Sequence, residues 1–297
     1  MPQPSSRTWI AFLTVIAAWG SSYLFIRLAV ASFTPVGLVM TRFGLASLVC
    51  ALIAVARHES FPRGGTALRF AAVGMLMMTG SNSLTAFAQH SVSSGLTGVM
   101  HSLGSVWLAA LGSLGAFGAD VPRTPRRAWW GVGLGVAGVV LLLWPSDGKL
   151  WAEPSGIAAL LLSTFLFAGA SVLQRRTQAR VQNGLFSQLA VQMAGGAVLA
   201  GVLATHFGVL HAPVTASSAL AMGVLTLFAS VVGFGAFAIV LRDWPPARAG
   251  SFGVVNPVVA VLLGVIVLKE ALTLQMVLGA LVTLAGVAWV QRVTARG

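Results

Sequence analysis

Charged residues are scarce in this chain of 297 residues. They make up 8% of the sequence, whereas hydrophobic residues make up 57%. Roughly a quarter of the residues in soluble domains are charged, so this scarcity excludes an ordinary soluble protein. Apolar runs of about 18 residues or more recur along almost the whole length, and each is long enough to span a bilayer core of about 30 Å. The sequence therefore predicts an all-α, polytopic membrane protein.

Acidic residues and cysteines are rarer still, with six Asp and Glu and one Cys in the whole chain. The single cysteine, Cys50, excludes a disulfide framework, makes a zinc site improbable and is interpreted as a small packing residue. None of the acids lies in the middle of an expected span, so the common carboxylate proton relay is absent. No Ser/His/Asp constellation or metalloprotease spacing stands out. We expect neither an enzyme nor a cofactor nor a metal.

Basic residues are more frequent, and the 18 Lys and Arg give a net charge of +12. A nucleic-acid partner would require them on one face or arm, but they form short groups between apolar runs. We therefore expect membrane lipid and a small-molecule substrate as partners, and no nucleic acid. The first apolar run, Trp9 to about Val30, is too long for the core of a cleaved signal peptide and is expected to be a retained helix.

The distribution of Lys and Arg predicts the topology. Of the 18 cations, 14 fall at the two chain ends or in alternate connections, which indicates the cytoplasmic side of the inner membrane. Both termini are then cytoplasmic. The expected spans are roughly residues 9–30, 36–56, 67–90, 94–118, 127–144, 155–175, 184–206, 216–241, 249–268 and 273–291.

The two halves of the chain, 1–148 and 149–297, form an internal repeat of five spans each. Trp19 and Arg27 align with Phe167 and Arg175 at an offset of about 148 residues. Landmark glycines also align near the end of each half. Because five is odd, the second copy enters the membrane from the opposite side. Inverted repeats of this kind are common in secondary transporters, which hold their substrate between the halves.

Several short motifs resemble the EamA-type permeases of the drug/metabolite transporter superfamily, and most of all the YddG-type amino-acid and metabolite exporters. The motifs are Trp19 to Tyr23, Pro35, Arg42, Asn256-Pro257, Leu263 to Glu270, Gly279 and Gly286. The resemblance implies ten helices, alternating access, and a central cavity lined mainly by spans one, three, four, six, eight and nine. The first half departs from the family's Gly/Glu ending, because it has Gly118 where the second has Glu270.

Polar and aromatic side chains deep within the spans are the candidates for substrate binding, because polar groups in hydrocarbon usually face a cavity or a partner helix. An Asn amide suits a zwitterionic substrate, a neutral His binds substrate or relays a proton, and two aromatic rings form an apolar slot. Interhelical hydrogen bonds and ordinary core packing are the alternatives. The candidates are Trp19, Tyr23, Thr79, Asn82, His101, Ser105, Trp107, Ser163, Phe167 and Asn256.

Two further predictions concern movement. Gly250, Gly253 and Pro257 in the ninth span are expected to form a hinge, because proline leaves the Gly253 carbonyl without its helical partner; a simple packing kink is the alternative. Arg42 is costly inside a bilayer. We expect it to pair with Glu270 as an outer latch.

Residues 133–138 match the dinucleotide-binding fingerprint by letter, but they lie inside an expected span rather than between a strand and a helix. There, Gly131 and Gly135 are expected to provide a flat surface for close helix packing.

The sequence thus favours a secondary transporter of amino acids or similar small metabolites. A multidrug or nucleotide-sugar carrier of the same superfamily is an alternative, and an integral-membrane enzyme or a channel is an alternative of another class.

Overall fold

The structure of the chain is a computed structural model that describes residues 6–115, 125–143, 153–178, 181, 183–244 and 252–294. Over these ranges the regular secondary structure is helical, apart from one isolated bridge between Phe33 and Leu210, which confirms the predicted all-α class. The first half contains α1 (Ser6–Ala29), α2 (Pro35–Ala56), α3 (Gly64–Gly74), η1 (Met75–Ser81), α4 (Asn82–Ala88), α5 (Ser94–His101), α6 (Gly104–Ser113) and α7 (Ala128–Leu143). The second half contains α8 (Pro154–Gln178), α9 (Leu185–Phe207), α10 (Ala216–Val224), η2 (Leu225–Val232), α11 (Gly233–Asp243), α13 (Phe252–Leu268) and α14 (Leu274–Thr294).

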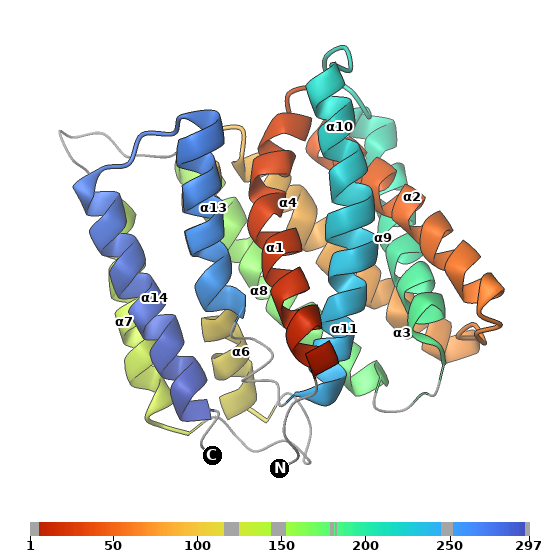
Figure 1. Cartoon of the computed structure of the whole chain (residues 1–297), viewed down its shortest axis with the longest axis horizontal. Helices are drawn as coiled ribbons and strands as arrows, with labels where there is room; N and C mark the ends of the chain where they lie inside the picture. The colour runs from red at the N-terminus through yellow and green to blue at the C-terminus, as the bar shows by residue number, and fades with distance from the viewer. Residues whose placement is uncertain are drawn as a thin grey trace.

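These helices form ten segments that run from one end of the bundle to the other (Figure 1). Three segments are composite: α3–η1–α4, α5–α6 and α10–η2–α11. In the part of the chain that the structure describes, six helices are long and apolar enough to cross a membrane, and two apolar helices are shorter. The 24 residues of α1 span about 36 Å at 1.5 Å per residue, more than the hydrocarbon core requires.

The outer surface of the bundle is apolar. Leu48 and Leu52 on α2 are 62% and 71% exposed, and Trp130 on α7 is 79% exposed. Water does not tolerate a continuous apolar surface of this size, whereas lipid hydrocarbon does. The exposed leucines therefore confirm a membrane-spanning bundle. Cys50 is buried and unpaired, as expected for a packing residue.

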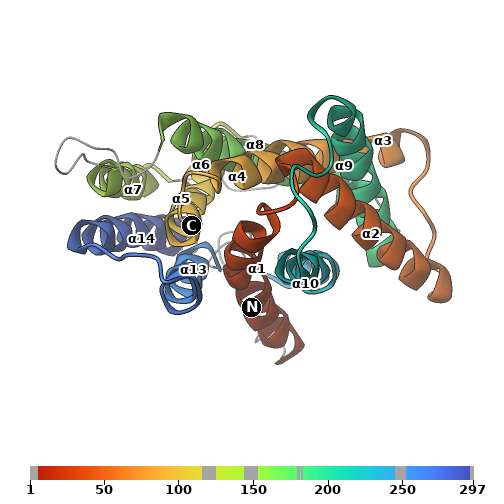
Figure 2. The same ribbon diagram turned by 90° about the horizontal axis from the view of Figure 1, so that it is seen from above.

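The packing of the helices repeats between the two halves. Helix α2 packs against α9, α5 against α13, and α7 against α14, so each contact joins the same span of both halves (Figure 2). Helix α1 packs against α11 and α13, just as α8 packs against α4 and α6. Exchanging the halves leaves this pattern unchanged. The arrangement is that of two inverted five-helix repeats.

The third and eighth spans each contain a π-helical segment, η1 and η2, which was not predicted from the sequence. In both segments a polar side chain binds the backbone carbonyl five residues before it. Asn82 Nδ2 donates to the Met77 carbonyl at 2.8 Å, and Ser230 Oγ donates to the Leu225 carbonyl at 2.9 Å. Asn82 and Ser230 are separated by the repeat offset of 148 residues, and so are Met77 and Leu225. The irregularity is therefore part of the repeat.

Glycines allow α7 and α14 to pack in backbone contact. A Cβ atom on Gly138 would lie 2.3 Å from the Thr283 nitrogen, and one on Gly286 would lie 2.4 Å from the Gly135 nitrogen. A Cβ on Gly131 would lie 2.6 Å from the Gly286 carbonyl oxygen. The structure confirms that this glycine-rich run serves helix packing.

Helix α1 begins and α14 ends at the same end of the bundle (Figure 1). We call this the terminal end and the other the opposite end. Helices that start at the opposite end have clear capping signals. The Thr34 hydroxyl accepts a hydrogen bond from the Gly37 amide at 3.0 Å, and Thr215 forms a capping box with Ser218.

The fourth span differs from the expected continuous helix over residues 94–118. Helix α5 ends at His101 and α6 begins at Gly104, with a short turn between them. No proline marks this break. The Ser102 hydroxyl donates to the Val99 carbonyl at 2.6 Å, and the Ser102 amide donates to the same carbonyl at 3.1 Å. The break places His101 and Ser102 beside the cavity described next.

Candidate functional site

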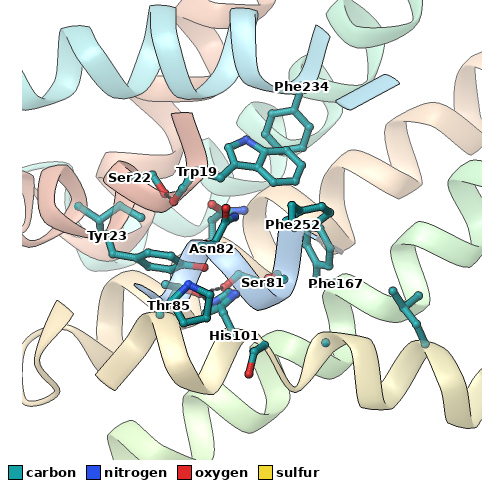
Figure 3. A pocket seen from close by; sticks show the side chains of 18 of the residues that line it. Trp19, Ser22, Tyr23, Ser81, Asn82, Thr85, His101, Phe167, Phe234 and Phe252 are labelled. Carbon is teal, nitrogen blue, oxygen red and sulfur yellow. Dashed lines mark hydrogen bonds between the residues drawn. The ribbon is translucent and has the colours of Figure 1, made fainter. Parts of the chain in front are cut away.

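A cavity of about 100 Å³ lies between the two halves and is lined by seven of the ten spans. These are the spans that the resemblance implied, together with α2. Figure 3 shows how the aromatic and polar side chains converge on it. The lining residues are Trp19, Ser22, Tyr23, Ile26, Arg42, Ser81, Asn82, Thr85, Gly98, His101, Ser102, Gly104, Leu108, Phe167, Phe234, Phe252, Gly253, Asn256 and Pro257.

One wall of the cavity is aromatic and is centred on Trp19. The Trp19 ring centroid lies 6.4 Å from that of Phe167, 5.0 Å from Phe234 and 5.2 Å from Phe252. All three contacts are edge-to-face, the geometry that aromatic quadrupoles prefer. Trp19 Nε1 donates to the Ala229 carbonyl at 3.1 Å, which fixes the ring. This wall suits an apolar or aromatic group.

The other wall is polar. The Thr85 hydroxyl lies 2.8 Å from His101 Nε2 and 2.8 Å from the Ser163 hydroxyl, which in turn lies 3.0 Å from the Ser81 hydroxyl. The Tyr23 ring lies beside that of His101, with centroids 5.4 Å apart and ring planes tilted by 54° (Figure 3). Segment η1 and helices α4, α5 and α8 therefore contribute to one hydrogen-bonding cluster, and α1 places the Tyr23 ring against it. Its hydroxyl and imidazole groups are uncharged or weakly basic, and both donate and accept.

Arg42 contributes the cavity's cation. Its side chain is 2% exposed, its Nε donates to the Ser230 hydroxyl at 2.8 Å, and its guanidinium carbon lies 4.6 Å from the Phe43 ring centroid. Nη1 is buried without a hydrogen-bond partner. A buried donor without a partner costs about 1–3 kcal/mol, and more when it is charged. Arg42 is thus held at one nitrogen and unsatisfied at another.

The expected latch between Arg42 and Glu270 is wrong, because the two side chains bind elsewhere. Glu270 accepts hydrogen bonds from the backbone nitrogens of Ser94 at 2.8 Å and Gly95 at 3.1 Å, at the first turn of α5. A helix N-terminus attracts a carboxylate through its free amides and its dipole. A Cβ on Gly264 would lie 2.4 Å from Glu270 Oε2, so the glycine makes room for this contact.

Asn256 on α13 is a second unsatisfied residue of the cavity. Its side chain is 4% exposed, and Oδ1 is buried without a partner. Pro257 follows within the helix, and Gly253 also lines the cavity. The predicted hinge at Gly253 and Pro257 therefore lies beside the cavity, while Gly250 lies outside the described residues. Their hinge role stays a prediction.

The cavity brings together six of the ten residues predicted to bind substrate: Trp19, Tyr23, Asn82, His101, Phe167 and Asn256. Three others lie elsewhere. Thr79 donates to the Gly196 carbonyl on α9 at 2.6 Å, Trp107 Nε1 donates to Thr164 on α8 at 3.1 Å, and Ser163 lies behind the polar wall. The alternative interpretation, helix–helix contact, describes Thr79 and Trp107. The side chain of Ser105 lies outside the described residues.

Sequence reasoning missed several lining residues. Thr85 lies three residues after Asn82 and so on the same face of α4, a spacing that identifies it once Asn82 is placed. Phe234 and Phe252 are large apolar residues in apolar runs, where sequence alone does not separate a cavity wall from a lipid-facing surface. Arg42 was recognised from the sequence as a costly cation inside the bilayer, but the direction of its side chain toward the cavity was not predicted.

Carboxylates are absent from the lining residues that the structure describes. In the same described ranges, no group of three or more His, Cys, Asp or Glu could hold a metal ion. The cavity thus combines an aromatic wall, a neutral polar wall and one cation.

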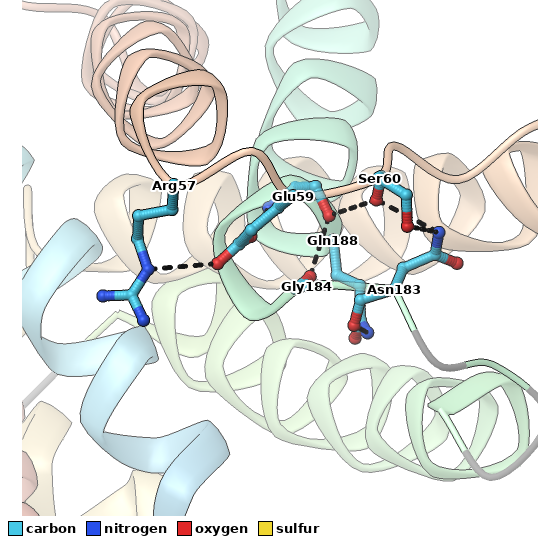
Figure 4. A network of polar contacts seen from close by, with 7 residues as sticks. Arg57, Glu59, Ser60, Asn183, Gly184 and Gln188 are labelled. Carbon is cyan, nitrogen blue, oxygen red and sulfur yellow. Dashed lines mark hydrogen bonds and ion pairs between the residues drawn. The ribbon is translucent and has the colours of Figure 1, made fainter.

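A second polar network lies at the terminal end, between the α2–α3 connection and α9 (Figure 4). Glu59 Oε2 accepts from the Ser187 nitrogen at 2.9 Å, and Oε1 lies 3.5 Å from Arg57 Nε. The Asn183 amide donates to the Ser60 carbonyl at 3.1 Å. Glu59 thus binds the first turn of α9 at one end of the bundle, as Glu270 binds that of α5 at the other. Each carboxylate joins the two halves.

The chain is similar to known membrane transporters along almost its whole length. The model of the EamA-like transporter family matches residues 7–144 and again residues 154–292. The "Uncharacterized inner membrane transporter YedA" of Escherichia coli (strain K12) is 31% identical over 255 residues, covering 86% of this chain and 80% of that protein. An "Uncharacterized transporter" of Archaeoglobus fulgidus is 23% identical over 291 residues, covering 95% and 97%. A crystal structure with 20% sequence identity shares the fold, with a TM-score of 0.68 over 99% of both chains.

Proposed function

Because the chain belongs to the EamA-like transporter family, we propose that it is a secondary transporter that moves amino acids or similar small metabolites across the inner membrane by alternating access. The observation that carries the proposal is the position of the cavity. It lies between two inverted halves and is lined by residues of both, as the sites of repeat-built transporters are.

The composition of the cavity supports the substrate class. A small amphipathic metabolite offers an apolar group for the aromatic wall around Trp19 and polar groups for the cluster around Thr85 and His101. A cavity of about 100 Å³ is well below the roughly 300–1,000 Å³ of pockets that hold drug-sized ligands, which disfavours a large drug or a nucleotide sugar. The absence of carboxylates among the described lining residues also disfavours cationic drugs as substrates.

The two halves would rock against each other to expose the cavity alternately to each side. The glycine contacts of α7 with α14 lie away from the cavity, whereas Gly253 and Pro257 would give α13 local compliance beside it. Because the lining residues that the structure describes include no carboxylate, facilitated diffusion or coupling through His101 is favoured over tight proton antiport.

The test is flux of labelled amino acids into proteoliposomes that contain the purified chain, with and without a pH gradient. We expect saturable uptake and accelerated counterflow when unlabelled substrate is present inside. A linear, non-saturating flux would indicate a channel. If no compound of an amino-acid, organic-acid and drug panel moves, the transport proposal fails and an enzyme becomes the better hypothesis.

The orientation needs a separate experiment. We propose that both termini, and with them the Glu59 network at the terminal end, face the cytoplasm, because most of the cations lie at that side. Reporter fusions at both ends that fluoresce only in the cytoplasm should both be bright. One bright and one dark fusion would contradict an even number of spans.

A further inference from the structure

Two of the described residues that line the cavity, Arg42 and Asn256, have a buried side-chain atom without a hydrogen-bond partner. Arg42 Nη1 is a buried donor without a partner, and Asn256 Oδ1 is a buried acceptor without a partner. Both side chains are more than nine-tenths buried. Buried polar groups in folded proteins nearly always have partners, so two orphans of opposite kind in one cavity indicate a ligand.

Contacts with the eighth span hold the Arg42 side chain in a fixed position from which it can bind a ligand. Its Nε donates to the Ser230 hydroxyl at 2.8 Å, and that hydroxyl donates to the Leu225 carbonyl of the π-helical segment η2 at 2.9 Å. The guanidinium is thereby anchored from the eighth span, although Arg42 itself belongs to the second. A planar guanidinium fixed at Nε keeps its remaining N–H groups for an anion, which it binds in a fork.

The positive charge of Arg42 favours a ligand that carries a negative charge. Arg42 is the one fully charged residue among the described lining residues, and no carboxylate there neutralises it. An anionic group on the ligand would do so, whereas a cationic ligand would be repelled. Glu270, the carboxylate expected to pair with Arg42, is bound to the first turn of α5 instead.

We propose that Arg42 binds the anionic group of the transported molecule and that Asn256 Oδ1 accepts a hydrogen bond from a donor next to that group. The inference rests on the proposed function, and it narrows the substrate to a small anion or zwitterion with an apolar part. The aromatic wall around Trp19 receives the apolar part. An α-amino acid with an apolar side chain has all three groups, while a simple carboxylate or phosphate ester has two.

The test measures binding rather than flux, by calorimetry and by the rise in unfolding temperature of the purified full chain in detergent. Four probes share one phenyl group: L-phenylalanine, 3-phenylpropanoate with the acid alone, 2-phenylethylamine with the amine alone, and phenyl phosphate. We expect the acid to bind and the amine not to bind. The phosphate probe distinguishes a carboxylate substrate from a phosphorylated one.

Variants assign the two contacts separately. R42Q should weaken binding of L-phenylalanine and 3-phenylpropanoate by about 30-fold or more, since losing one partner of a buried charge pair has at least this effect. R42K should retain part of the affinity, because lysine keeps the positive charge but cannot donate two parallel hydrogen bonds as a guanidinium does. N256A should weaken L-phenylalanine and leave 3-phenylpropanoate unchanged. A misfolded variant would lose both ligands together, so this selective loss excludes a folding artefact.

The matched control is R292Q, which replaces an exposed arginine on α14 and should leave all affinities unchanged. If R42Q binds the acids as tightly as the unaltered chain, or if the amine binds more tightly than the acid, the assignment of Arg42 is overturned. Binding of 3-phenylpropanoate that depends on Arg42, without any amino-acid flux, would instead reject amino-acid transport and keep the anion site.

Discussion

Trp19 and Phe167 meet edge to face between the two halves, with ring centroids 6.4 Å apart and ring planes at 89°. The two residues are separated by the repeat offset of 148 positions, so the same place in each half provides one ring. Neither half forms this contact alone. It stabilises the interface of the halves and at the same time forms the apolar wall of the cavity.

Truncation of Trp19 should therefore destabilise the bundle strongly. The W19A variant removes a buried ring with four aromatic neighbours, and substitutions of this kind cost about 3–5 kcal/mol. We expect a clear drop in the midpoint of thermal unfolding in a fixed detergent. W130A, which removes an exposed ring from α7, is the control and should shift the midpoint little. Equal shifts for both variants would contradict the assigned role of Trp19.

The contact of Glu270 with α5 predicts local opening at the opposite end of the bundle. E270Q removes the charge, and E270A also removes both acceptors of the Ser94 and Gly95 amides. Hydrogen bonds to a charged group contribute about 1.5–3 kcal/mol each. Hydrogen–deuterium exchange at these two amides should accelerate modestly in E270Q and strongly in E270A. The exposed Glu153 provides the control, since E153Q should leave the exchange at α5 unchanged.

The contact of α7 with α14 offers a matched pair of glycines on one helix. A Cβ at Gly138 would overlap the Thr283 backbone, whereas the space around Gly133 is open within 4 Å. G138A should lower the unfolding midpoint because the helices must separate. G133A should leave it unchanged or raise it slightly, because alanine favours a helix by about 0.5–1 kcal/mol relative to glycine. A lower midpoint for G133A and not for G138A would reject the close packing.

Stability should depend on pH through His90, in the connection after α4. Burial, and then the charges of His211 and Arg27, lower the pKa of His90 below its ordinary value of 6.5. The folded chain then binds the proton less readily than the unfolded chain, so stability is complete above about pH 6.5 and falls as the pH drops below it.

The measurement is the unfolding midpoint between pH 8 and pH 5, compared between the unaltered chain and H90Q. The decrease at low pH should be smaller in H90Q. H206Q, at an exposed position near the end of α9, should keep the decrease of the unaltered chain. The His90 and His211 rings lie 5.8 Å apart, so H211Q should also reduce it. Parallel curves for H90Q and the unaltered chain would exclude His90 as the source.

The spans could be predicted because a long apolar run is visible in the sequence itself and does not depend on contacts between distant residues. A run such as residues 36–56 is apolar along nearly its whole length, with Arg42 as its one charged residue, and helix α2 covers Pro35–Ala56. The break of the fourth span had a weaker signal, because Ser102 and Leu103 are compatible with a helix, no proline is present, and Gly104 is one of several glycines in this span. The π-helical segments were missed for the same reason: Met75–Ser81 reads as ordinary helix until the Asn82 amide is seen to bind the Met77 carbonyl.

The cavity could be predicted in part. Asn82, His101 and Asn256 could be predicted because a polar side chain is costly in hydrocarbon and usually faces a cavity or a partner helix. All three line the cavity. Arg42 was found by the same reasoning and paired wrongly. Its depth in the second span is readable from sequence, but the direction of its side chain depends on the contact with Ser230, 188 residues away.

The π-helical turns have a consequence for how this fold diversifies. Such a turn accommodates one residue more than a regular helix, and that residue rotates everything beyond it by about 100° around the helix axis. Removing a single amino acid from η1 would restore a regular helix that still crosses the bilayer, yet it would turn Asn82 and Thr85 away from the cavity. Insertion or deletion of one codon in η1 or η2 would thus change which side chains face the cavity, and with them the substrate specificity, while the bundle still spans the membrane.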